Sequence, residues 1–167
     1  PAWIETVKSL RPDFPVYGSM IECSECLTRL VGQAMTDYCH AHKLPVIYHG
    51  CGNVKSILGD FAKMKVDAYI PLEVKAKLDV IELGKEYGHR LGFCGNSDIQ
   101  IWETGDRELI RREVIRKLNA ARGGGYIFQS DHSVTSGVSG ETYDYIVKLV
   151  RQYGDYPLEL REFSMDL

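Results

Sequence analysis

Short apolar runs alternate with longer amphipathic stretches from residue 44 to the end of the chain. Each apolar run is bounded by glycine or polar residues, which is typical of a buried strand. The four predicted strands are Leu44–Tyr48, Asp67–Leu72, Arg90–Gly95 and Gly125–Gln129. The stretches that follow them have the spacing of amphipathic helices, with glycine as the stop signal after two of them. These predicted helices are Val54–Lys65, Ala76–Tyr87, Arg107–Arg122 and Glu141–Tyr153.

This alternation predicts an α/β fold in which a parallel sheet is built from repeated βα units. Before residue 44, the sequence suggests a helix at Trp3–Leu10, a strand-like piece at Phe14–Met20 and a long helix at Glu25–His42. Four clear βα units make about half of a (β/α)₈ TIM barrel, which usually needs about 250 residues. No linker or second composition divides residues 1–167, and the chain starts at Pro1 without a methionine. We therefore expect one domain that forms the C-terminal part of a longer barrel.

The amino-acid composition excludes only a few classes of function. Hydrophobic residues make up 44% of the chain, charged residues 26%, and the net charge is −3. These values fit an ordinary globular protein and give no support for nucleic-acid binding. No apolar stretch reaches the roughly 18 residues that a membrane span needs. Five cysteines in no framework pattern favour a reducing compartment, so we expect a cytoplasmic protein.

Residues with metal-binding or acid–base chemistry follow the predicted strands where each strand ends. In parallel α/β folds, ligands bind at the carboxyl ends of the strands. All four predicted strands place such residues there, which makes a shared site the natural expectation. In chain order the residues are His49 and Cys51, then Glu73, then Asn96 and Asp98, and finally Asp131 and His132.

Histidine, cysteine and glutamate together form a donor set that suits zinc. We predict His49, Cys51 and His132 as firm ligands and Glu73 as an exchangeable one. The alternative for His49 and Cys51 is a hydrogen-bonded core histidine and a small buried thiol. For Asn96 and Asp98 the alternative is an ordinary turn, because Gly-Asn-Ser-Asp is common turn chemistry.

A second metal motif, Cys23 and Cys26 with Cys39 and His42, has a spacing similar to that of a zinc finger. The residues between its two halves read as one continuous helix. On one helix, Cys26 and Cys39 would lie about 20 Å apart at 1.5 Å per residue. We therefore do not expect these residues to share an ion.

Five motifs in a fixed order resemble the uroporphyrinogen decarboxylase superfamily. They are PVIYHGCGN at 45–53, PLE at 71–73, FCGNSD at 93–98, GGGYIFQSDHSV at 123–134 and YGDYP at 153–157. The resemblance covers about residues 25–157 and implies the C-terminal half of a (β/α)₈ barrel.

The resemblance points more closely to one branch of this superfamily. Its decarboxylases act on tetrapyrroles without a metal, and His132 stands where they carry a histidine. Its cobalamin-dependent methyltransferases carry a His-x-Cys zinc motif, a distant cysteine and a glutamate. His49, Cys51 and Glu73 match that pattern, and His132 replaces the distant cysteine.

The leading hypothesis is therefore a zinc-dependent, corrinoid-linked methyltransferase. Glu73, Asp98 and His132 are its predicted catalytic residues, and Asn96 and Asp131 its predicted substrate-binding residues. The expected cofactors are Zn²⁺ and a corrinoid such as methylcobalamin as methyl donor. The expected partners are a small-molecule substrate, a corrinoid protein, and an N-terminal half-barrel or a second copy, without which this chain should be inactive. The alternatives are a metal-free tetrapyrrole decarboxylase and a non-catalytic half-barrel that binds a corrinoid or a partner.

Overall fold

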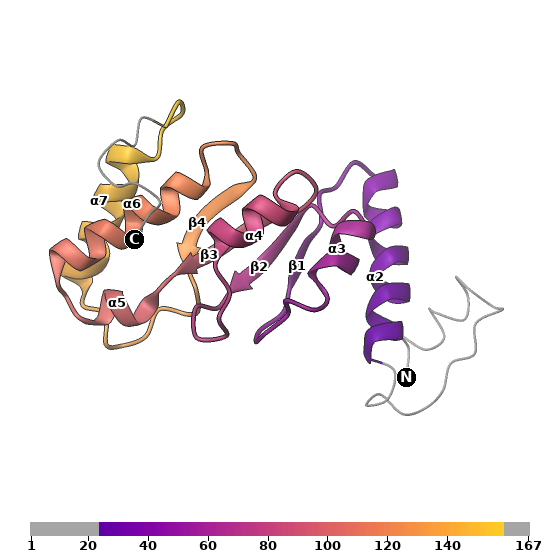
Figure 1. Ribbon diagram of the computed structural model, residues 1–167, viewed down its shortest axis with the longest axis horizontal. Helices are drawn as coiled ribbons and strands as arrows, with labels where there is room; N and C mark the ends of the chain where they lie inside the picture. The colour runs from indigo at the N-terminus through magenta and orange to yellow at the C-terminus, as the bar shows by residue number, and fades with distance from the viewer. Residues whose placement is uncertain (1–23, 159–167) are drawn as a thin grey trace.

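The computed structural model describes residues 24–158 of the chain, which form six helices and four strands (Figure 1). The helices within this range are α2 (Ser24–Ala41), α3 (Leu58–Lys63), α4 (Val80–Tyr87), α5 (Ile99–Glu103), α6 (Arg107–Ala120) and α7 (Gly140–Tyr153), while the strands are β1 (Ile47–His49), β2 (Ala68–Leu72), β3 (Gly92–Ser97) and β4 (Tyr126–Ser130).

The four strands form one parallel sheet in the order β1-β2-β3-β4. Each strand pairs with the next in sequence, from Ile47 opposite Ala68 to Ser97 opposite Ser130. A register irregularity interrupts the β2–β3 pairing between Tyr69 and Leu72. This confirms the predicted α/β fold of parallel βα units, an arrangement consistent with part of a TIM barrel. Within residues 24–158, β1 and β4 each pair on one edge only.

Two apolar clusters hold the helices against the sheet. The first joins α3 and α4 to the first three strands and includes Leu58, Phe61 and Met64. The second joins α5, α6 and α7 and receives Phe128 from β4. Helices α6 and α7 lie side by side beyond β4 (Figure 1). Burial of these side chains fixes the strands, and so fixes the loops that leave their carboxyl ends.

Several boundaries differ from the sequence prediction for local reasons. The short helix α5 was not predicted; it begins after Asp98, whose side chain accepts a hydrogen bond from the backbone N–H of Gln100. Strand β3 continues to Ser97 instead of ending at Gly95. The predicted helix at Val54–Lys65 is shorter, because α3 begins only at Leu58. The predicted ends of α4 and α7 at Gly88 and Gly154 are confirmed.

Helix α2 is continuous from Ser24 to Ala41, as the sequence predicted for the region between the two halves of the zinc-finger-like motif. Cys26 and Cys39 therefore lie on one helix and are about 20 Å apart along it. The elements suggested at Trp3–Leu10 and Phe14–Met20 lie outside the described residues. No helix in the described part of the chain is both long and apolar enough to cross a membrane.

A buried ionic network connects α6 to the sheet. The Lys117 ammonium donates a hydrogen bond to Asn96 Oδ1 at 2.7 Å and lies 3.7 Å from Glu113 Oε1. Lys117 and Glu113 are only 3% and 8% exposed. Burial raises the pKa of Glu113 and lowers that of Lys117, because each charged form loses water. The network ties the C-terminal half of α6 to the end of β3.

Candidate metal centre

The carboxyl ends of the four parallel strands lie along the same edge of the sheet. The residues directly after these strands therefore approach one another, although they are far apart in sequence. Cys51 follows β1, Glu73 follows β2 and His132 follows β4. Asp98 follows β3 and caps helix α5.

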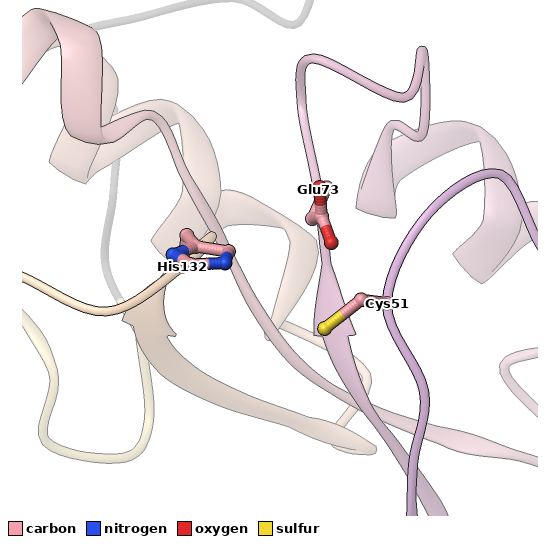
Figure 2. A group of neighbouring side chains, drawn as sticks. All are labelled: Cys51, Glu73 and His132. Atoms are coloured by element: carbon pink, nitrogen blue, oxygen red, sulfur yellow. The ribbon is translucent and has the colours of Figure 1, made fainter.

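Three of the predicted site residues form a compact cluster of donor atoms. The donor atoms of Cys51, Glu73 and His132 all lie within 4.8 Å of one another. Figure 2 shows the three side chains approaching a common space from three separate loops. Cys51 and His132 are exposed and Glu73 is half-buried. The cluster is therefore open to a ligand from solvent.

His49 lies beside this cluster. Its Nε2 is 3.6 Å from the Sγ atom of Cys51, but His49 is not one of the three mutually close donors. The His49 side chain is exposed at the end of β1, and exposed side chains change rotamer within picoseconds to nanoseconds. The four residues predicted as ligands therefore lie near one another, three of them in the cluster and His49 beside Cys51.

The donor set fits a zinc ion chemically. Thiolate sulfur, imidazole nitrogen and carboxylate oxygen are the three ligand types that zinc takes in proteins. A tetrahedral zinc ion holds its donor atoms roughly 3.3–3.8 Å apart, given bonds of about 2.0–2.3 Å. The 3.6 Å separation of Cys51 and His49 already lies in that range. The cluster limit of 4.8 Å requires only a small contraction.

The loop that carries Cys51 is held by hydrogen bonds to the backbone groups of the glycines on both sides of it. The Gly50 N–H donates to the Ile70 carbonyl at 2.8 Å, and the Tyr69 hydroxyl donates to the Gly50 carbonyl at 2.6 Å. On the other side, the Gly52 N–H donates to Glu73 Oε1 at 2.9 Å. Cys51 is thus fixed by its two glycine neighbours. Sequence patterns do not indicate this role of Tyr69, which has the position of an ordinary aromatic residue in a strand.

Gly50→Ala tests this loop, because a Cβ at Gly50 would lie 2.5 Å from the Tyr69 hydroxyl oxygen. Overpacking of this kind costs about 1–3 kcal/mol, and the displaced loop should weaken zinc binding by roughly 10-fold. Urea denaturation and zinc titration measure the two effects. Gly140→Ala is the control, because a Cβ there meets nothing within 4 Å.

A double variant separates this clash from other effects of the alanine. Gly50→Ala with Tyr69→Phe removes the hydroxyl and leaves the ring carbon Cζ at an ordinary 3.5 Å from the new Cβ. Zinc affinity should recover toward that of Tyr69→Phe alone. An unchanged affinity in Gly50→Ala itself would show that the loop does not depend on this contact.

The pKa of the thiol in the cluster is shifted by its surroundings. Partial desolvation, and then the neighbouring Glu73 carboxylate, raise the pKa of the Cys51 thiol. Burial also raises the pKa of Tyr69 far above its ordinary value. A divalent cation among the donors opposes these effects, because a thiol that coordinates a metal is deprotonated.

The predicted substrate-binding residues are both buried. Asn96 is 0% exposed, and its side chain makes four hydrogen bonds: it donates to the carbonyls of Leu72 and Leu78 and accepts from Val80 N–H and Lys117. These bonds hold Asn96 in the left-handed region at a φ of 70°. Asp131 is 1% exposed and accepts two backbone hydrogen bonds. Neither side chain presents an exposed atom to a substrate.

Asp98, predicted as catalytic, is half-buried at the start of α5. Its Oδ1 accepts the hydrogen bond from Gln100 N–H, and its own N–H donates to Glu113 Oε1 at 2.9 Å. It is not among the three clustered donors. Asp98 is therefore the N-cap of a helix and not part of the ordinary turn that the sequence left open as its alternative.

The family to which the chain belongs follows from comparison with known proteins. No curated protein matches the chain. The family model described as "Uroporphyrinogen decarboxylase (URO-D)" matches residues 24–153. The match includes all four strands and the three clustered donors. The chain belongs to the uroporphyrinogen decarboxylase family.

Proposed function

We propose that this chain is part of a zinc-dependent, corrinoid-linked methyltransferase of the uroporphyrinogen decarboxylase family. The observation that carries the proposal is the cluster of Cys51, Glu73 and His132 at the carboxyl edge of the sheet. A thiol and an imidazole beside a carboxylate are a set that selects zinc. A decarboxylase that works without a metal has no need of this combination.

The residues of the cluster divide into permanent and exchangeable donors. Cys51, His132 and the adjacent His49 would hold the ion, and Glu73 would occupy the fourth position until an acceptor arrives. Glu73 suits this task because its Oε1 is also bonded to the Gly52 N–H. A Glu73 carboxylate that is not bound to the ion would keep this partner and would not be an unpaired charge.

Zinc held here would bind a substrate thiol as the nucleophilic thiolate, and the thiol proton would pass to the solvent to which the cluster is open. The charges of the donors agree with such an exchange. A Cys51 thiolate and a Glu73 carboxylate would neutralise the two charges of a zinc ion, and histidine ligands would add no charge. Replacing the carboxylate with an incoming thiolate leaves the total charge unchanged. Asp98 is the candidate for orienting the acceptor.

A methyl group on a corrinoid is the proposed donor, either as free methylcobalamin or on a corrinoid protein. The site also needs further protein around it. Within residues 24–158, β1 and β4 each have one unpaired edge, and unpaired sheet edges are usually covered by another part of a protein. We propose an N-terminal half-barrel or a second copy of the chain for this place.

Thiol binding to a cobalt(II)-loaded chain tests the proposed function. Cobalt(II) replaces zinc in such sites and shows a thiolate-to-metal absorption band. Addition of a simple alkanethiol should about double this band, since Cys51 supplies one thiolate and the acceptor a second. Cys39→Ala, in helix α2, is the control and should respond like the wild type.

Two results would contradict the proposal. One is a cobalt-loaded chain whose absorption does not change with thiol. The other is a chain that takes up no metal but binds a tetrapyrrole, which would favour the decarboxylase alternative.

A further inference from the structure

Asp131 is a buried carboxylate that connects three loops at the carboxyl edge of the sheet. Its Oδ2 accepts a hydrogen bond from the Val74 N–H at 3.0 Å, and its Oδ1 accepts one from the Ile99 N–H at 3.1 Å. Its own N–H donates to the Ser97 carbonyl at 2.8 Å. Since the residue is 1% exposed, a solute cannot reach the carboxylate directly.

The partners of Asp131 are the neighbours of the candidate ligands. Val74 directly follows Glu73 in sequence, and His132 directly follows Asp131 itself. Strands β2 and β4, which carry these two ligands, do not pair with each other because β3 lies between them. The bond from Asp131 to Val74 therefore crosses a gap that the sheet hydrogen bonds do not bridge.

The loop positions on either side of this link are fixed as well. The Leu72 carbonyl, just before Glu73, accepts a hydrogen bond from Asn96 Nδ2 at 3.0 Å. The His132 carbonyl accepts one from Ser130 Oγ at 2.6 Å. Asp131 thus makes a direct link between two loop segments that are each anchored at the neighbouring residue.

We propose that Asp131 is a positioning residue that sets the distance between Glu73 and His132 and so prepares the site for its metal. This inference rests on the proposed function. A carboxylate is the side chain that this position requires, because both of its oxygens accept backbone N–H groups. An asparagine could accept only one of these bonds and would turn its NH₂ group toward the other N–H.

Cobalt(II) titration of the full chain tests the proposal. Asp131→Asn should weaken cobalt affinity by roughly 10- to 100-fold, the usual effect of removing a group that orients metal ligands. The thiolate-to-cobalt band per bound ion should persist, since Cys51 is unchanged. The visible d–d bands should lose intensity as the four-coordinate geometry relaxes. Circular dichroism measures the folded fraction, and the affinity is expressed per folded chain.

Asp106→Asn is the matched control. Asp106 also accepts two backbone hydrogen bonds, from Glu108 and Leu109 at the start of α6, but it adjoins no candidate ligand. Its cobalt affinity should stay within about 2-fold of the wild type. Should Asp131→Asn fail to fold, the same titration on Asp131→Glu decides, because a carboxylate displaced by one methylene should also weaken binding and alter the d–d bands.

Wild-type affinity and wild-type spectra in a folded Asp131 variant would overturn the proposal. An equal loss in Asp106→Asn would overturn it too, because the effect would then reflect general destabilisation. Absence of cobalt binding by the wild type would instead contradict the proposed function together with this inference. The two failures are therefore distinguishable.

Discussion

Cys51→Ala is expected to lower the zinc affinity of the chain by about 100-fold or more. Structural zinc sites gain about 10–16 kcal/mol from roughly four ligands, so one thiolate accounts for about 3 kcal/mol or more. Cys51 is the one sulfur donor in the cluster of Cys51, Glu73 and His132. Competition with a chromophoric chelator measures the affinity. The variant should fold normally, because the Cys51 side chain is exposed.

Cys39→Ala is the control for this experiment, because Cys39 is a partly exposed free cysteine in α2. It should retain the zinc affinity of the wild type. Equal affinity in Cys51→Ala and the wild type would show that the thiol is not a ligand. An equal loss in both variants would point to a global effect of cysteine removal.

Lys117→Met is expected to destabilise the fold by about 3–5 kcal/mol at neutral pH. Removal of one partner from a buried ion pair leaves the other charge without compensation, and that cost is large. Here the remaining group is Glu113, which is 8% exposed and whose pKa burial already raises. Urea denaturation measures the change. The control is Lys148→Met. Lys148 is exposed and pairs with Asp144 at 2.6 Å, so its replacement should lower the free energy of unfolding by about 0.5 kcal/mol or less.

The destabilisation in Lys117→Met should depend on pH with a definite sign. Since the folded-state pKa of Glu113 is raised, the folded protein holds this proton more tightly than the unfolded chain does. The raised pKa therefore contributes to the free energy of unfolding below the unfolded-state pKa of Glu113. This contribution is lost as the pH rises through the folded-state pKa. The deficit should shrink between pH 7 and pH 5, and Glu113→Gln in the same chain should recover most of it. A deficit that is constant with pH would show that lost packing, not the charge, is responsible.

The sequence was sufficient to predict the fold because its patterns are local. Runs such as Asp67–Leu72 are apolar and short, and the structure places β2 at Ala68–Leu72. Glycines at 88 and 154 correctly marked helix ends. The short helix α5 was missed because its five residues are too few to show a helical period.

The candidate site was predicted in part, since strand order alone brings residues from different loops to one edge. This reasoning found Cys51, Glu73 and His132, which the structure brings together. It could not separate residues whose side chains face this edge from those that turn inward. Asn96 and Asp131 follow strands in the same way, yet their polar atoms are used by backbone groups of neighbouring loops. Such partners depend on three-dimensional loop paths, which no local pattern encodes.

Zinc content of the purified chain, measured together with its thermal stability, tests the central claim most directly. We predict about one zinc per chain in the wild type, a rise in melting temperature on zinc addition, and loss of both in Cys51→Ala. A chain that contains no zinc and gains no thermal stability from it would contradict the account.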